Sequence, residues 1–144
     1  MQLNGCDVMI WLAICTFLFH FLNITGFKVK RFVLVESCIK NEPQDIPFHI
    51  FFATSIIIFF IYPHVGKWML FGFFTLVTIG MFFTTIRFII FPNEKKAKSY
   101  NLFFANTHHI IKPQEKLLIP DTYHIVLLLV FPVNLIAIII YIVN

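Results

Sequence analysis

Residues 46–91, IPFHIFFATSIIIFFIYPHVGKWMLFGFFTLVTIGMFFTTIRFIIF, decide the fold, and they carry formal charge only at Lys67 and Arg87. A helix crosses a bilayer with about 20 mainly apolar residues, because each adds about 1.5 Å toward a hydrocarbon core about 30 Å thick. The stretch is long enough for two such helices, and the segment from Tyr62 to Lys67, with its proline and glycine, favours a tight turn between them. It therefore predicts a helical hairpin inside a membrane.

Two more uncharged windows of similar length, Val8–Phe27 and Thr122–Asn144, flank this hairpin. The chain is 59% hydrophobic and 12% charged, which excludes an ordinary soluble domain of 144 residues. We therefore expect an all-α, polytopic membrane protein, a bundle of four transmembrane helices that forms one domain over residues 1–144. The predicted spans are residues 8–25, 47–62, 68–91 and 122–143.

Basic residues cluster in the two predicted loops, residues 26–46 and 92–121. Lys and Arg in short loops beside a span stay on the cytoplasmic side of a membrane. We therefore place both loops in the cytoplasm and both chain termini in a lumen or outside the cell. This orientation also accounts for the net charge of +4, so we expect no nucleic-acid partner. The loop cations are Lys28, Lys30, Arg31, Lys40, Lys95, Lys96, Lys98, Lys112 and Lys116, whereas the opposite side carries only Lys67.

Polar side chains inside a bilayer are costly, and each one marks a candidate site. His20 in the first predicted span and Asn134 in the fourth are the candidates for intramembrane polar contacts. A hydrogen bond between helices is the alternative to ligand or cargo binding at Asn134. No acid or lysine lies deep in a predicted span, so we expect no catalytic residues.

The histidines raise the question of a metal or haem. His108 and His109 are adjacent, and adjacent residues point about 100° apart on a helix, unlike a pair of metal ligands one turn apart. A haem between spans takes one histidine from each of two helices, and His20 has a predicted depth similar to that of His109 and His124. We expect no metal and no cofactor, with haem ligation at His20 as the alternative.

Loop three, residues 92–121, is the largest predicted segment outside the hydrocarbon. Residues 100–111 place phenylalanines on neighbouring helical rows, which predicts a short amphipathic helix at the membrane surface, with an irregular apolar segment under the bundle as the alternative. We take Leu102, Phe103 and Phe104 as candidate binding residues. In the third span, Gly72 and Gly80 predict the close approach of a neighbouring helix.

Cys38 is followed by Pro43 and Pro47, and Tyr100-Asn101 lies near the start of loop three. These residues, with four spans, outward termini and a long basic third loop, resemble the cornichon family of membrane cargo receptors. The family's coat-contact pattern falls at Leu102-Phe103-Phe104.

The resemblance implies a non-enzymatic adaptor that exports other integral membrane proteins from the endoplasmic reticulum. Its location would be the endoplasmic reticulum and Golgi, and its partners would be the lipid bilayer, its cargo, and coat or trafficking machinery. Lys28-Val29-Lys30-Arg31 stands where the family carries an acidic stretch.

Asn41 and Pro47 match the phase of the glutathione motif in the membrane-associated eicosanoid and glutathione metabolism family. Ser37 and Gln44 replace the arginine and glutamate that would hold the charged groups of glutathione. A glutathione-dependent membrane enzyme is therefore one alternative function. A small accessory subunit of a larger membrane complex is another.

Overall fold

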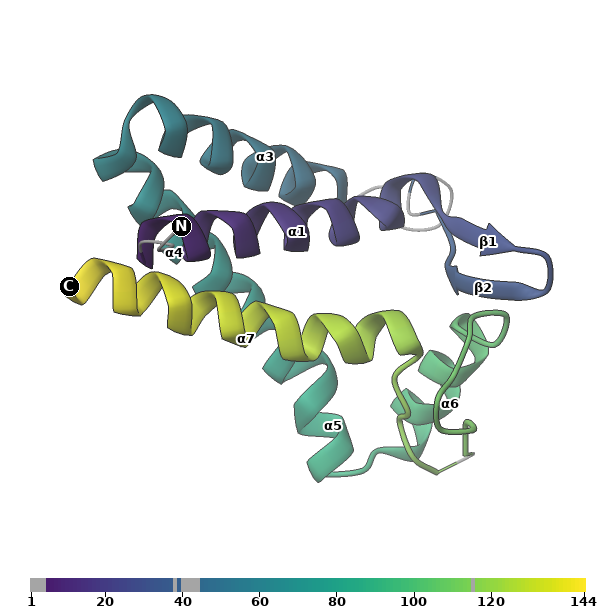
Figure 1. The fold of residues 1–144 in the computed structure, drawn as a ribbon. Helices are drawn as coiled ribbons and strands as arrows, with labels where there is room; N and C mark the ends of the chain where they lie inside the picture. The colour runs from purple at the N-terminus through teal and green to yellow at the C-terminus, as the bar shows by residue number, and fades with distance from the viewer. Residues whose placement is uncertain (1–4, 38, 40–44, 115) are drawn as a thin grey trace.

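The computed structural model describes residues 5–37, 39, 45–114 and 116–144. The described chain is mostly helical (Figure 1), which confirms the predicted all-α class, although a small β-hairpin is added. Cys38, Lys40, Asn41, Pro43 and Gln44 lie outside the described residues. The elements are α1 (Gly5–Thr25), β1 (Phe27–Val29), β2 (Phe32–Val35), α3 (Ile46–Ile61), α4 (Pro63–Met81), the π-helical segment η2 (Phe82–Ile86), α5 (Arg87–Ile90), α6 (Glu94–Phe103) and α7 (Thr122–Val143).

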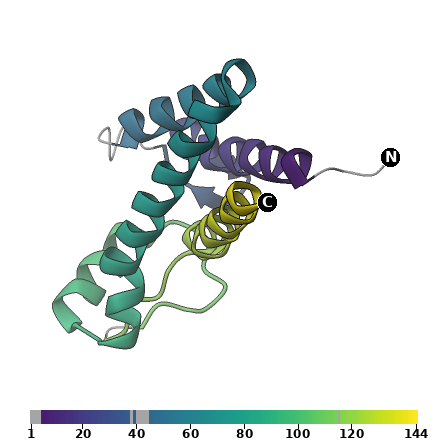
Figure 2. The ribbon, with the colours of Figure 1, turned by 90° about the vertical axis from the view of Figure 1, so that its left-hand side faces the viewer.

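Four helices form the bundle, and each packs against two others: α1 and α4 both contact α3 and α7. Figure 2 shows α7 nearly end-on, with the long helix that begins as α4 running past it. The core between them is aromatic. Phe52 of α3 stacks on Phe73 of α4 with ring centroids 4.3 Å apart, and Phe131 of α7 lies 6.2 Å from Phe74. These buried rings hold the helices together through apolar area and ring geometry.

Three helical segments are long and apolar enough to cross a membrane: Cys6–Thr25, Pro63–Ile90 and Thr122–Val143. The second of these joins α4, η2 and α5 into one continuous helix. α3 is also apolar, but its 16 residues measure only about 24 Å at the helical rise. The predicted membrane protein is therefore supported by three helices, and the predicted span at residues 47–62 is not confirmed.

The turn between α3 and α4 is sharper than the sequence predicts. Tyr62 alone separates the two helices, and α4 begins at Pro63 rather than near residue 68. Proline fits the first turn of a helix because its missing N–H would have had no partner there. The predicted loop of six residues is thus mostly helix.

Close approach of the two helices occurs at Gly66. A Cβ added at this position would stand 2.2 Å from the Cα of Phe59 in α3. The predicted close approach at Gly72 and Gly80 is wrong, because nothing lies within 4 Å of a Cβ built at either position. The glycine nearest the turn is therefore the one that the packing requires.

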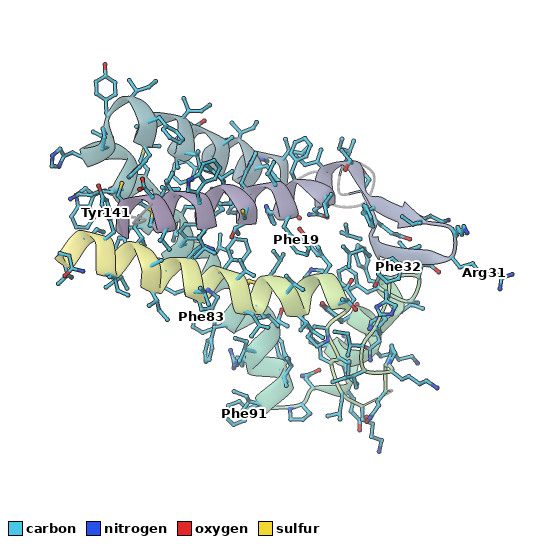
Figure 3. The ribbon with its side chains drawn as sticks, in the orientation of Figure 1. Phe19, Arg31, Phe32, Phe83, Phe91 and Tyr141 are labelled. Atoms are coloured by element: carbon cyan, nitrogen blue, oxygen red, sulfur yellow. The ribbon has the colours of Figure 1, made fainter. Side chains whose placement is uncertain are left out.

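The first loop contains an antiparallel hairpin that the sequence analysis did not predict. Gly26 follows α1 with a φ of +73°, a conformation that glycine adopts without strain. Val29 pairs with Phe32, and the turn between them includes Lys30 at a φ of +55°. Arg31 marks the tip in Figure 3. The cations interleaved with the apolar residues hide the strand pattern in the sequence.

The helix of loop three lies earlier than predicted. α6 covers residues 94–103 rather than 100–111, and the side chain of Asn93 caps it by accepting the Lys96 N–H at 3.0 Å. Turns and irregular backbone follow from Phe104 to Ile111. The prediction of a helix over residues 100–111 is therefore wrong beyond Phe103, and the alternative of an irregular segment describes residues 104–111 better.

The two predicted cytoplasmic loops touch. The His108 N–H donates to the Val33 carbonyl at 2.6 Å, and the His108 ring lies 4.7 Å from that of Phe32, which Figure 3 labels. The His108 carbonyl accepts from the Thr122 N–H at 2.8 Å, where α7 starts. The end of α1 and the start of α7 therefore lie at the same end of the bundle (Figure 1).

Candidate functional site

A cavity of about 750 Å³ lies between α1, the α4–η2–α5 helix, α6 and α7. We call it the interhelical cavity. Its volume falls within the range of small-molecule sites, about 300–1,000 Å³. Its walls come from one face of α6, from η2, from the first three turns of α7, and from single side chains near α1 and α3.

The α6 wall follows directly from helical spacing. Lys96, Ser99, Tyr100 and Phe103 all line the cavity, and their separations of three, four and seven residues place them on one helix face. Lys95, one position along, lines a different hollow on the outside. Lys96 therefore borders the cavity, although its side chain is exposed, whereas Lys95 and Lys98 line the outer hollow.

The η2 wall is a stretch of π-helix, a form that appears mostly as short bulges and often at functional sites. Phe83, Thr84 and Thr85 from this segment line the cavity, and Phe83 is labelled in Figure 3. Thr85 is buried, whereas the exposed Thr84 hydroxyl donates to the Gly80 carbonyl at 2.9 Å. The segment therefore adds hydroxyl groups to an otherwise aromatic wall.

An Asp–His pair marks the start of α7. The fully buried Asp121 caps the helix, and its Oδ1 atom accepts from the His124 N–H at 2.9 Å. The same oxygen lies 2.6 Å from Nδ1 of the His124 ring. Because Nδ1 faces the carboxylate, Nε2 is left for other contacts, and the ring lines the cavity. No hydrogen bond to Nε2 is made within the described parts of the chain.

Asp121 is ionised at neutral pH in this arrangement. Burial acts to raise the pKa of its carboxyl group, but hydrogen bonds from His124 and the charge of that ring hold the pKa below its ordinary value. Imidazole and carboxylate thus form a fixed unit, in which the carboxylate sets the orientation of the ring.

His20 lines the cavity from α1, at the level of Phe131, where the ring centroids are 5.6 Å apart. The His20 ring also stacks on the ring of His49 in α3, with the ring centroids 4.0 Å apart. The Nδ1 atom of His20 is buried and has no hydrogen-bond partner among the described residues. A buried polar atom of this kind is uncommon and requires an explanation.

The ring of His49, which stacks on His20, lies between two backbone carbonyl groups. His49 places Nδ1 at 2.8 Å from the Asp45 carbonyl and Nε2 at 3.0 Å from the His20 carbonyl, and a neutral ring donates to one of them at a time. The Asp45 carboxylate, which also lines the cavity, accepts from Asn23 Nδ2 at 3.1 Å. Apart from Nδ1 of His20, the polar groups on the α1–α3 side of the cavity are therefore hydrogen-bonded to one another.

The polarity of the cavity lining changes along α7. His124 lies at its outer part, and Leu127 and Phe131 follow at one and two turns, about 10 Å deeper at the helical rise. Val77 and Met81 of α4 line the wall as well. Near loop three, Lys96, Ser99 and His124 are thus interspersed with phenylalanines, whereas toward the middle of the bundle the lining is apolar except for His20.

The cavity brings together three of the five residues singled out from the sequence. His20, Phe103 and Phe104 all line it, and the Phe104 ring lies 4.7 Å from His124. Leu102 points outward with 75% of its surface exposed. Asn134 lies elsewhere: it is buried, and its Nδ2 donates to Thr16 Oγ1 at 2.7 Å, which joins α7 to α1.

Metal ligands do not gather in the described part of the chain: no three His, Cys, Asp or Glu side chains come together there. Of the pairs considered for haem, His20 and His124 share the cavity, whereas Nε2 of His109 lies 2.9 Å from the Phe104 carbonyl.

Ser37 stands at the position of the glutathione-binding arginine, and it donates its hydroxyl to the Ile24 carbonyl.

Sequence reasoning missed the Asp121–His124 unit and Lys96, the lysine that lines the cavity. Both have a local signal. An aspartate cap followed three residues later by histidine places the ring beside the carboxylate. The spacing of Lys96, Ser99, Tyr100 and Phe103 marks one face of a helix, provided that the helix is started at Asn93.

No known family model matches this chain, and neither the characterised proteins nor the solved structures include a significant match. The resemblances to cornichon proteins and to the glutathione family therefore stay predictions, and the function proposed below is argued from the cavity.

Proposed function

We propose that this chain is an integral membrane protein with four spans that binds an amphiphilic small molecule in the interhelical cavity. The four spans are α1, α3, the α4–η2–α5 helix and α7. Loops 26–46 and 92–121 lie in the cytoplasm, because they carry most of the Lys and Arg residues.

The contact between the two loops supports four spans over three. The hairpin that follows α1 is bonded to the segment that precedes α7, through His108 and Val33. Both loops must then lie on one side of the membrane, which requires an even number of crossings between them. The helix Pro63–Ile90 is long enough to provide one crossing, so α3 must provide the other.

The shortness of α3 is compatible with a crossing. Its length of about 24 Å falls below the thickness of an average hydrocarbon core. A short span is accommodated by local thinning of the bilayer and by flanking side chains, at a cost of fractions of a kcal/mol per Å. Tyr62 at the end of α3 is 65% exposed and is an aromatic residue of the kind that lies at the interface.

The polarity gradient of the cavity is the observation that carries the ligand proposal. An amphiphile has a polar head and an apolar tail, and the cavity offers Lys96 and His124 at one end and Leu127 and Phe131 at the other. The polar end faces loop three, where headgroups of the cytoplasmic leaflet lie in the proposed topology. Pockets between transmembrane helices at this depth are typical sites for lipid headgroups.

Photocrosslinking tests the proposal. Full-length protein in mild detergent is irradiated with a diazirine-bearing long-chain amphiphile, and crosslinked peptides are mapped. We expect labels on η2, α6 and the start of α7, and we expect Leu127→Trp to remove them by filling the apolar end. Leu129→Trp is the control, since Leu129 is 65% exposed on the outer face. Labels confined to lipid-facing positions, unchanged by Leu127→Trp, would refute cavity binding.

An adaptor for membrane cargo of the endoplasmic reticulum and Golgi is the second candidate. The observation that favours it is the exposed apolar surface of loop three, where Leu102, Ile110 and Ile111 are 75%, 63% and 56% exposed. We expect mild-detergent pull-downs to recover integral membrane proteins and trafficking components, and Leu102→Ser to reduce the trafficking components. Recovery of no membrane-protein partner would count against an adaptor and leave the cavity proposal untouched.

A further inference from the structure

We propose that the amphiphile in the interhelical cavity carries an anionic oxygen head, a carboxylate or a phosphate monoester, held between Lys96 and the ring of His124. This inference rests on the proposed function and specifies the chemical class of its ligand.

Lys96 provides the positive charge. It is the one α6 lysine that lines the cavity, since Lys95 and Lys98 line the outer hollow with Glu94 and Lys116. The ion pair between Lys116 and Glu94, at 3.7 Å, is also on that outer side. Lys96 forms no ion pair with the described residues and its side chain is exposed, so its ammonium group is available to a ligand.

His124 provides a directed contact. The Asp121 carboxylate holds Nδ1 and thereby fixes the ring plane, as carboxylates do for histidines that bind metals or substrates. Tyr100 links the two groups in space: its ring lies 6.0 Å from that of His124, and Lys96 lies one helical turn before it on the same face. Lys96, Ser99 and His124 all line the cavity, and we assign the head to this part of it.

The opposite charge in the cavity, Asp45, lies on the other wall. Its carboxylate accepts a hydrogen bond from Asn23 Nδ2 at 3.1 Å, and its backbone carbonyl lies 2.8 Å from Nδ1 of His49. Apart from Nδ1 of His20, the polar groups of the α1–α3 wall are thus bonded to one another, whereas the α6–α7 wall presents Lys96 and His124 to a ligand. An anionic head is therefore attracted to α6 and α7 rather than to α3, with its tail beside Phe131.

The experiment compares three probes of the full-length protein in mild detergent: a long-chain carboxylate, the alcohol of equal chain length, and inorganic phosphate alone. We expect the carboxylate to bind more tightly than the alcohol. Lys96→Met should weaken carboxylate binding about tenfold, the effect of losing one charged hydrogen bond, and leave the alcohol unchanged. His124→Gln should weaken it by a similar factor.

Lys95→Met is the matched control, because it removes the same charge from the same helix but from the outer hollow. His64→Gln, at the exposed start of α4, is the control for His124→Gln. Thermal unfolding checks that each variant folds. Equal losses for carboxylate and alcohol, or equal effects of Lys95→Met and Lys96→Met, would overturn the anionic head while leaving an amphiphile site.

Two other outcomes are informative. Binding of inorganic phosphate as tight as that of the carboxylate would assign the head site to a soluble anion and overturn the amphiphile. Failure of both the carboxylate and the alcohol to bind would instead refute the proposed function, on which the head assignment rests.

Discussion

At the scale of single residues, the polar atoms of the bundle are explained mostly by partners within it. Asn134 joins α7 to α1 through Thr16 and also donates to the Val130 carbonyl at 2.9 Å. The Thr16 hydroxyl in turn donates to Leu12 of its own helix. Hydrogen bonds of this kind between transmembrane helices contribute about 0.6–2 kcal/mol each.

We expect Asn134→Ala to lower the free energy of unfolding in detergent by about 1–2 kcal/mol, because the interhelical bond is lost. Thr16→Val should cost less, and the double variant should cost less than the sum of the two. Equilibrium unfolding of all four proteins gives the coupling energy. Strict additivity would show that Asn134 and Thr16 do not interact.

The charge on Asp121 predicts a dependence of stability on pH. Because the folded pKa lies below the unfolded value of about 3.9, the carboxylate stabilises the fold above that pH, and the contribution is lost as pH falls through the folded pKa. Asp121→Asn should therefore lower Tm at pH 7, and the difference from the unmodified chain should shrink below pH 4. A difference that stays constant down to pH 3 would contradict the assignment.

At the scale of elements, the joint between α3 and α4 depends on Gly66. We expect Gly66→Ala to destabilise the protein by about 1–3 kcal/mol, because the new methyl group collides with the Phe59 backbone. Gly72→Ala is the control, and it should be neutral or slightly stabilising, since alanine favours helix and nothing lies near the new atom. Similar losses in the two variants would show that the helices do not touch at Gly66.

The sequence predicts helices well where apolar windows are long. α1, the α4–η2–α5 helix and α7 lie close to the predicted spans, because length and lack of charge are enough to identify them. The sequence predicts helix boundaries poorly where tertiary packing or helix capping sets them. Tyr62 and Pro63 shorten the turn, and the Asn93 cap starts α6 at Glu94, six residues before the predicted helix. Glycine spacing alone did not reveal that Gly66, rather than Gly72, contacts a neighbour.

The site was predictable only in parts. His20, Phe103 and Phe104 stand out as polar or aromatic residues in informative places, but their meeting in one cavity depends on how α6 folds back toward α7. That path is set by contacts between distant residues, such as the hydrogen bond from Asn101 Nδ2 to the Leu117 carbonyl at 2.9 Å. Periodicity within a segment contains no information about such a contact.

At the scale of the whole molecule, the contact between loops predicts which surfaces share a side of the membrane. In a background with the native cysteines replaced by serine, we expect Lys28→Cys and Lys98→Cys to react with an impermeant thiol reagent from the same side. His64→Cys should react only from the opposite side. If α3 did not cross, residues 28 and 98 would be labelled from opposite sides, so the pair distinguishes four spans from three.

The hydrogen bond between Thr16 and Asn134 joins residues 118 positions apart, and it links α1 to α7. At a synthesis rate of about 5–20 residues per second, α1 precedes its partner by on the order of ten seconds. During that time the Thr16 hydroxyl is satisfied by its own helix, at Leu12, so a newly made α1 can wait in lipid without an unpaired polar group. The ligand cavity, which needs α7 for one of its walls, is then completed only after α7 has been synthesised.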